Sequence, residues 1–215
     1  ARLLRDMPSG ELRGKCGVVG LRLQQELRGQ SCLPLDLVPS PKQETCVSRS
    51  FSRPITTSDG LREAVATYVV RAAEKLRRQR QCAAALTIYT RTSPFVPAFY
   101  SQAASTRLDV ASNDTQVLLQ AALPLVERIF RPHRQLAKAG VLMQNLQDEN
   151  IRQSHLFCQQ TTLDLQKRDQ LMKTMDAINL KYGRGSLVYA AQGLSQPWLM
   201  PVSYTHLTLP TKVSG

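Results

Sequence analysis

The sequence has few aromatic residues, few histidines and no long apolar run. Aromatic residues make up 6% of the 215 positions, so base stacking on single-stranded nucleic acid is expected to be minor. The 3 histidines have no metal-ligand spacing and the 5 cysteines form no Cys-x-x-Cys pair, which argues against a structural metal or a disulfide framework. No apolar stretch is long enough to cross a bilayer, and the scattered cysteines suit a reducing cytoplasm.

Acidic residues are also scarce relative to basic ones. Lysine and arginine total 28 against 16 aspartates and glutamates, which gives a formal net charge of +12 and a pI near 9.9. Such a surface attracts polyanions, with nucleic acid ahead of an anionic membrane. The alternative is a soluble basic protein without a polyanionic partner. We consider nucleic acid the better interpretation of this charge.

The clearest local pattern lies between residues 46 and 89 and predicts a strand, a helix and a second strand. In residues 46–51, small polar or cysteine residues alternate with Val47, Arg49 and Phe51, and Pro54 is expected to end this strand. Ser58 or Asp59 is expected to cap the helix that follows. Its apolar stripe, at a period near 3.6, consists of Leu61, Val65, Tyr68, Val69, Ala72 and Leu76. The helix should end near residues 81–82, before a buried strand at 83–89.

A second strand, helix and strand follow in the same order. Residues 105–110 read as a short strand, and Asn113 or Asp114 is expected to cap a helix that Pro124 kinks or divides. Residues 135–146 return as an apolar strand. The order β-α-β-β-α-β over residues 46–146 predicts an α+β fold with a ferredoxin-like arrangement.

The segments on either side of this domain are predicted to have other structures. Residues 1–29 are expected to form short helices joined by glycine turns, and the glycines of residues 12–20 could cradle a phosphate or form a plain turn. Since Ala1 opens a helical pattern without an initiator methionine, we expect a piece of a longer protein. Prolines make residues 30–45 a linker. Residues 147–200 are interpreted as a flexible tail containing one amphipathic helix at 163–180 and a strand-like stretch at 186–191.

Several short motifs together resemble one family. They are Leu27-Arg28-Gly29, Lys42-Gln43-Glu44, Ser48-Arg49-Ser50-Phe51, Arg71-Ala72-Ala73-Glu74-Lys75-Leu76-Arg77, Thr92-Ser93-Pro94-Phe95, Lys138-Ala139-Gly140-Val141 and Gly183-Arg184-Gly185. Between about residues 3 and 198 the chain resembles the UmuC-type catalytic subunits of Y-family translesion DNA polymerases and their plasmid-borne relatives. The resemblance implies a role in the bacterial SOS response. It assigns residues 1–29 to the end of the helical thumb and residues 46–146 to the little finger, which grips template–primer duplex.

The resemblance also indicates how DNA would be bound. A little finger holds the sugar–phosphate backbone through strand edges and basic side chains, without reading sequence. The candidate DNA-binding residues are Ser48, Arg49, Ser50, Arg53, Arg91, Thr92, Arg107 and Lys138. We expect Arg49 and Arg107 to share one face of the sheet. A second basic stripe, Arg71, Lys75 and Arg78, lies on the predicted helix and is interpreted as solvated.

The segment Gln153-Ser154-His155-Leu156-Phe157 matches the family's Gln-x-x-Leu-Phe clamp-binding peptide. The resemblance therefore implies that Gln153, Leu156 and Phe157 dock on the sliding clamp. A leucine–phenylalanine pair can anchor in an apolar pocket while the glutamine fixes orientation. The further partners that the resemblance implies are a UmuD-type dimer and the RecA filament, in the bacterial cytoplasm at the nucleoid.

Two departures from the family limit the expected activity. No acidic cluster corresponds to the palm, whose carboxylates hold the catalytic metal ions, so Mg²⁺ is expected only in the parent enzyme. This chain is expected to need no cofactor and to be inactive alone. Residues 201–215 leave the family pattern and are interpreted as a foreign or frameshifted tail.

Two alternatives remain beside this interpretation. A non-enzymatic adaptor could use the basic sheet to bind RNA or acidic proteins, although it would have no reason to carry the Gln-x-x-Leu-Phe segment. A small metabolic enzyme on this fold would need convergent catalytic groups, and none is found in the sequence.

Overall fold

The computed structural model describes residues 1–33, 42–151 and 162–200. The chain forms two compact units, residues 1–41 and residues 42–215. The first contains α1 (Arg2–Asp6) and α2 (Ser9–Leu27). Gln24, only 1% exposed, joins these helices by donating from Nε2 to the carbonyl oxygens of Leu4, at 3.0 Å, and Met7, at 2.7 Å. The helix α2 begins at Ser9, before the predicted glycine turn of residues 12–20. Gly17, with a φ of +63°, interrupts its regular geometry.

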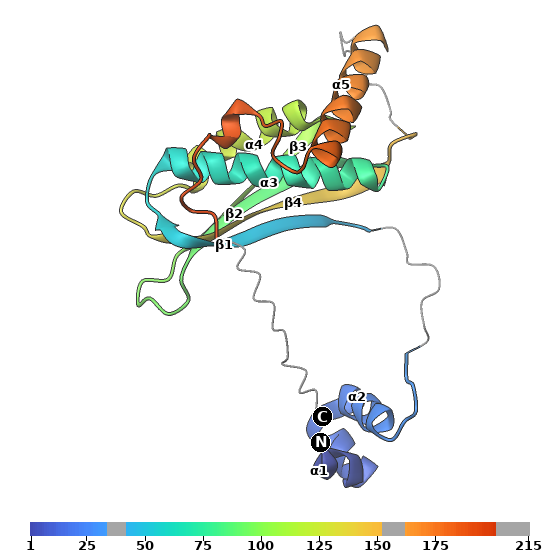
Figure 1. The fold of residues 1–215 in the computed structure, drawn as a ribbon. Coiled ribbons are helices and arrows are strands. Elements are labelled where there is room, and N and C mark those ends of the chain that lie inside the picture. The colour runs from blue at the N-terminus through green and yellow to red at the C-terminus, as the bar shows by residue number, and fades with distance from the viewer. Residues whose placement is uncertain (34–41, 152–161, 201–215) are drawn as a thin grey trace, which may run out of the picture. The chain divides into compact units, whose positions relative to one another are not determined.

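The second unit is built on a four-stranded antiparallel sheet. Its strands are β1 (Thr45–Ile55), β2 (Gln81–Thr92), β3 (Ser101–Ser112) and β4 (Leu136–Asp148), in the order β1-β4-β2-β3. The helices α3 (Ser58–Arg78) and α4 (Thr115–Ile129) connect β1 to β2 and β3 to β4, and each connection passes over one strand. Both helices cover the same face of the sheet (Figure 1). The predicted α+β class and β-α-β-β-α-β order are confirmed.

The helices begin where side chains satisfy their free backbone N–H groups. Asp114 caps α4 as predicted, since its Oδ1 accepts a hydrogen bond from the Gln116 N–H at 2.7 Å. The cap of α3 lies one residue before the predicted positions, at Thr57, whose Oγ1 accepts from the Gly60 N–H at 3.2 Å. Pro124 lies inside α4, and the helix continues through it rather than dividing.

The core fills the space between the two helices and the sheet. Every residue of the predicted α3 stripe is fully buried: Leu61, Val65, Tyr68, Val69, Ala72 and Leu76. They belong to one apolar cluster with Leu86 and Ile88 of β2 and Val141 and Met143 of β4. Full burial of such a side chain contributes about 1.5–3 kcal/mol, so this cluster holds the helices on the sheet.

Several predicted boundaries were wrong. Pro54 does not end β1, because Ile55 still pairs with Leu136 after a register shift that follows Ser50. An edge strand tolerates the missing proline N–H there. The strand β3 is longer than residues 105–110, and α3 ends at Arg78, short of the predicted 81–82. Residues 186–191 form no strand, and a short 3₁₀ helix, η1 (Ala190–Gln192), follows instead.

The chain beyond the sheet packs back on α3 and β1. The predicted helix at 163–180 is present as α5 (Thr162–Lys181), where Asp176 accepts two hydrogen bonds of 2.7 Å from the Arg77 guanidinium. Trp198, 4% exposed, meets Phe51 and Tyr68 edge-on, with ring centroids 5.9 and 6.0 Å apart. Its carbonyl also accepts a hydrogen bond from the Ser52 N–H at 3.1 Å. No local pattern in the sequence predicts these contacts.

Candidate nucleic-acid interface

The sheet has one open face, opposite α3 and α4. Side chains alternate between the faces of a strand, so the residues between core positions point to this open face. Val47, Ile88 and Val141 lie in the helix-side core. The residues that alternate with these core positions pair with one another across the strands in successive rows. They make up the open face: Cys46, Ser48, Ser50, Ala85, Thr87, Tyr89, Arg91, Ser101, Ala103, Ser105, Arg107, Lys138, Gly140, Leu142 and Gln144.

One row of the open face carries two adjacent cations. Lys138 of β4 pairs with Ser50 of β1 on one side and with Arg91 of β2 on the other, and Arg91 pairs with Ser101 of β3. Neither Arg91 nor Lys138 forms an ion pair with any acid that the structure describes. Two neighbouring cations flanked by serine hydroxyls can hold the phosphates of a nucleic-acid backbone.

The next row is flat in its middle because Gly140 has no side chain. A Cβ atom on Gly140 would lie 2.5 Å from Cζ of Tyr89 and 2.6 Å from Cβ of Ser48. The Tyr89 ring therefore lies over β4, in the space that a side chain at position 140 would occupy. Its phenol is half-exposed beside the cationic row and can donate to a phosphate or pack on a sugar.

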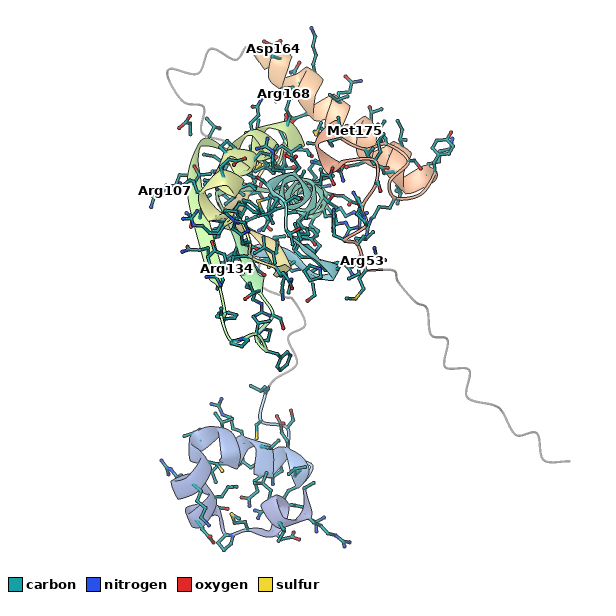
Figure 2. The ribbon with its side chains drawn as sticks, turned by 90° about the vertical axis from the view of Figure 1, so that its left-hand side faces the viewer. Arg53, Arg107, Arg134, Asp164, Arg168 and Met175 are labelled. Atoms are coloured by element: carbon teal, nitrogen blue, oxygen red, sulfur yellow. The ribbon has the colours of Figure 1, made fainter. Side chains whose placement is uncertain are left out.

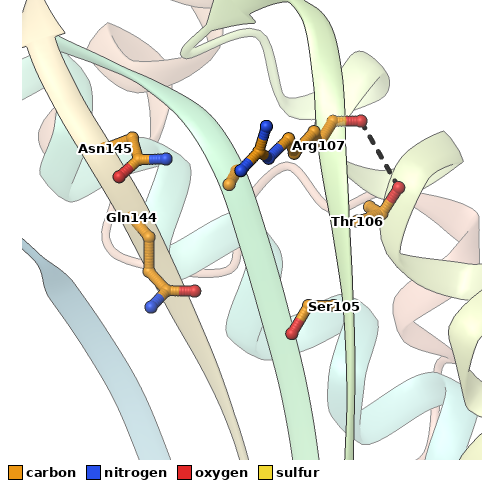
Figure 3. A pocket seen from close by; sticks show the side chains of 6 residues that line it. Ser105, Thr106, Arg107, Gln144 and Asn145 are labelled. Carbon is orange, nitrogen blue, oxygen red and sulfur yellow. Dashed lines mark hydrogen bonds between the residues drawn. The ribbon is translucent and has the colours of Figure 1, made fainter.

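The far end of the face is polar and forms a shallow hollow. The Thr87 hydroxyl lies 2.8 Å from that of Ser105 and donates to Oε1 of Gln144 at 2.6 Å. Arg107 extends from β3 across β2 toward Gln144 and Asn145, and these side chains line a hollow of about 390 Å³ (Figure 3). Arg107 therefore adds an exposed cation at the edge of the open face.

The expectation that Arg49 and Arg107 share a face was wrong. Arg49 pairs with Ala139, which belongs to the helix-side core, whereas Arg107 pairs with Ala85 on the open face. The two arginines therefore lie on opposite faces. Arg49 approaches α3, and its charge acts on Arg71 and Tyr68.

Two other candidates also lie away from the open face. Thr92 is 4% exposed, and its hydroxyl accepts a hydrogen bond from the Tyr100 N–H at 2.9 Å. Arg53 is exposed beyond the register shift of β1, so it lies at one edge of the sheet and Arg107 at the other (Figure 2). The structure brings together Ser48, Ser50, Arg91, Lys138 and, at the edge, Arg107.

Sequence reasoning missed several residues of the open face. Tyr89, Ser101, Ser105 and Gln144 were not among the candidates, although Tyr89 lies two positions before Arg91 on the same strand. The period of two was the signal that could have identified Tyr89. Ser101 and Ser105 needed the register between β2 and β3, which the sequence does not give.

The remaining predictions concern the clamp-binding segment, metal binding and membrane spans. The clamp-binding residues Gln153, Leu156 and Phe157 lie outside the described residues. Within residues 1–33, 42–151 and 162–200, no group of His, Cys, Asp or Glu side chains is arranged to hold a metal ion. None of the helices described there is long and apolar enough to span a membrane.

The fold and this face define a class: an α+β domain with one helix-covered sheet face and one open basic face. Residues 42–156, more than half of the chain, match the impB/mucB/samB family C-terminal domain. The chain belongs to this family. Residues 169–204 match a domain of unknown function, DUF4113. That second match covers most of α5 and the segment that carries Trp198.

Individual relatives agree with the family match. The chain is 34% identical over 191 residues to protein SamB of Salmonella typhimurium, which covers 88% of this chain and 44% of SamB. It is 34% identical over 191 residues to protein UmuC of Salmonella typhimurium, covering 88% and 45%. Protein MucB of Escherichia coli is 35% identical over 191 residues, covering 88% and 44%. The predicted UmuC-type, Y-family relationship is confirmed, and the chain spans less than half the length of these relatives.

Proposed function

We propose that this chain is the DNA-gripping C-terminal part of an error-prone translesion DNA polymerase that acts in DNA damage tolerance and the SOS response. The observation that carries the proposal is the row Ser50–Lys138–Arg91–Ser101, with its two cations free of described acidic partners on the open face. Membership of the impB/mucB/samB family supports it. The partner is template–primer duplex, held at the nucleoid in the bacterial cytoplasm.

The open face suits binding that ignores sequence. Serine hydroxyls, arginine and lysine contact phosphates, which are the same at every base pair, whereas base reading needs an element that enters a groove. At the centre of the face the Tyr89 ring lies over Gly140 and presents its phenol to an approaching backbone. A polymerase that copies past damaged bases needs a grip of this kind, since the grip must not depend on the template base.

The remaining functions of the parent enzyme extend this proposal. Gln153, Leu156 and Phe157 dock on the sliding clamp, and a UmuD-type dimer and a RecA filament assemble with the complete enzyme. The catalytic Mg²⁺ ions belong to a palm domain, so DNA binding by this chain requires no metal. We expect the chain alone not to extend a primer in the presence of Mg²⁺ and nucleotides, and incorporation by the pure chain would contradict this part of the proposal.

The DNA grip is tested by fluorescence anisotropy of a labelled primer–template duplex across a salt series. The double variant Arg91→Ala/Lys138→Ala should bind about tenfold more weakly and lower the log–log salt slope by about 2, because two phosphate contacts are lost. The matched control is Lys75→Ala/Arg128→Ala, which removes the same charge from exposed positions on α3 and α4.

The control variant should keep nearly all of the affinity. Equal losses in both double variants would show that binding follows net charge alone, and the open face would then not be the site. Replacing the DNA duplex with an RNA duplex distinguishes the proposed DNA grip from the adaptor alternative. Tighter binding to RNA through Arg91 and Lys138 would favour the adaptor.

The clamp contact is tested separately by binding of the chain to a purified sliding clamp. Leu156→Ala/Phe157→Ala should abolish measurable binding, because the two apolar anchors provide most of the contact energy. Ser154→Ala, within the same five residues, is the control and should bind normally. Unchanged binding by the double variant would remove the clamp from the proposal without affecting the DNA grip.

A further inference from the structure

A groove lies on the helix side of the second unit, away from the open face. The C-terminal segment, residues 182–200, runs beside α3 after the end of α5 (Figure 1). Between them is a groove of about 470 Å³, called the C-terminal groove below, whose walls include Arg71, Arg77, Arg184, Leu187, Val188 and Leu194. Much of it falls within the stretch that matches DUF4113, for which the match gives no function.

The charges in the groove do not balance. Arg77 is satisfied by Asp176 and by the Asn113 carbonyl oxygen, which accepts a hydrogen bond at 2.8 Å. The Glu74 carboxylate accepts from Arg78 at 2.6 Å and lies 3.8 Å from Arg184. It is therefore shared by two arginines, and Arg184 has the weaker contact.

Arg71 has no hydrogen bond or ion pair with any residue that the structure describes, although it is only partly exposed. Burial, together with the neighbouring charges of Arg49 and Arg184, lowers the pKa of its guanidinium. Arg71 and Arg184 thus line a space in which Asp176 is engaged by Arg77 and Glu74 by Arg78. Glu63 approaches the groove wall at Gly193, but it forms no ion pair with Arg71 or Arg184. An anion placed here would relieve this repulsion.

Part of the remaining wall is apolar and open to solvent. On the C-terminal segment, Leu187 is 40% exposed, Val188 is 42% exposed and Leu194 is 99% exposed. Val70, Met175 and Leu199 continue the apolar lining. Exposed apolar side chains beside a binding cavity are typical of surfaces that receive another protein. A ligand that fits this groove must carry a negative charge next to an apolar group.

We propose that the C-terminal groove binds a short peptide of a protein partner, with a carboxylate on Arg71 and Arg184 and an adjacent apolar side chain against Val188 and Leu194. A peptide suits the groove better than a nucleic-acid backbone, because a phosphate chain would leave the apolar wall unused. The groove and the open face lie on opposite sides of the sheet, so both can be occupied at once. This inference does not depend on the proposed DNA grip.

The test is an NMR titration of the whole chain with two capped tripeptides, acetyl-Leu-Glu-Leu-amide and acetyl-Leu-Gln-Leu-amide. The signals followed are the Nε–H groups of Arg71 and Arg184 and the indole N–H of Trp198, the single tryptophan. The glutamate tripeptide should shift both arginine signals saturably, with a Kd of about 1 mM as expected for so small a ligand. The glutamine tripeptide should bind at least about tenfold more weakly, because only the charge differs.

Variants locate the site and control for folding. Arg71→Gln and Arg184→Gln should each weaken binding of the glutamate tripeptide about tenfold, whereas Arg128→Gln on α4 should not change it. An unchanged Trp198 indole signal in the free variants shows that the C-terminal segment is still in place. Equal binding of both tripeptides, or an unchanged affinity in Arg71→Gln, would overturn the proposal.

Two other probes test the competing ligands. If inorganic phosphate shifts the Arg71 and Arg184 signals and the glutamate tripeptide does not, the groove is a phosphate site and the peptide proposal fails. If a primer–template duplex displaces the tripeptide, or binds more weakly to Arg71→Gln than to Arg128→Gln, the groove belongs to the DNA surface. Binding of tripeptide and duplex together, without competition, is the expected result.

Discussion

The second unit has two basic surfaces, and they differ in what surrounds the cations. On the open face, Arg91 and Lys138 stand among serines and beside Gly140, on a surface without a deep cavity. In the C-terminal groove, Arg71 and Arg184 are set among exposed leucine and valine side chains. A flat polar surface suits the repeating phosphates of a duplex, whereas a groove with apolar walls suits one charged group and its apolar neighbour. The neighbours of a cation, more than its charge, therefore decide its partner.

The largest expected effect comes from removing the side chain that anchors the C-terminal groove, which tests whether the two surfaces are independent. Trp198→Ala deletes a buried ring that packs on Phe51 and Tyr68, and should lower the free energy of unfolding by about 3–5 kcal/mol. Urea unfolding measures the loss, and Trp198→Phe, which keeps a ring, should lose much less. At temperatures where the variant is folded, its affinity for duplex DNA should stay close to normal. A parallel loss of DNA affinity would mean that the surfaces are coupled.

A smaller effect is expected from filling the flat centre of the open face. The Cβ of Gly140→Ala would overlap the Tyr89 ring, so this variant should lose about 1–3 kcal/mol of stability and bind DNA more weakly. Urea unfolding and anisotropy measure the two effects. In the double variant Gly140→Ala/Tyr89→Ala the overlap with the ring disappears and only the close contact with Cβ of Ser48 remains, so part of the lost stability should return. If the single variant is as stable as the original chain, close contact between Tyr89 and β4 is not needed.

The core beneath the groove gives a pH-dependent prediction. Burial raises the pKa of Tyr68 to about 12, and its hydroxyl has no hydrogen-bond partner among the described residues. In the unfolded chain this phenol ionises near its ordinary pKa of about 10, so stability should fall as the pH rises from about 10 to 12.

Tyr68→Phe should remove this part of the alkaline loss and stabilise the unit by about 1 kcal/mol at neutral pH, because no unpaired hydroxyl remains buried. Urea unfolding at pH 8 and at pH 11 measures both effects. Tyr182→Phe, at an exposed tyrosine, is the control and should change neither value. A variant that is less stable than the original chain at pH 8 would show that the hydroxyl has a partner.

The smallest expected effect concerns Arg49. Because Arg49 lies on the helix side of β1, Arg49→Gln should change the affinity for duplex DNA by less than about twofold, whereas Lys138→Gln should cost several-fold. Anisotropy at one low salt concentration is sufficient for this comparison. Equal losses in the two variants would show that the DNA reaches around the edge strand to the helix side.

The sequence was informative where local periods decide the structure. The 3.6-residue stripe of α3 identified six core residues, since a helix of this length buries its apolar stripe wherever it packs. The alternation in β1 had also grouped Arg49 with Val47 and Phe51, both of which are buried. This period alone places Arg49 on the buried face, whatever its charge.

Features that depend on distant contacts were not predictable in the same way. Trp198 lies far along the chain from Phe51, and no local period links them. The open-face role of Ser101 depends on its pairing with Arg91, which requires the register of the β2–β3 hairpin. The helical period predicts a solvated Arg71, because such a period cannot show that a later segment of chain covers one side of the helix.

The contact between Ser52 and the C-terminal segment has a consequence for how the unit is made. The Ser52 hydroxyl donates to the Pro197 carbonyl oxygen at 3.2 Å, across a sequence separation of 145 residues. During synthesis β1 leaves the ribosome long before the C-terminal segment. Phe51 and Tyr68 therefore lack their contact with Trp198 until synthesis has passed residue 198. Contacts of such high order slow folding and prolong the exposure of apolar surface. The nascent chain should therefore become fully resistant to proteases only once residue 198 has left the ribosome.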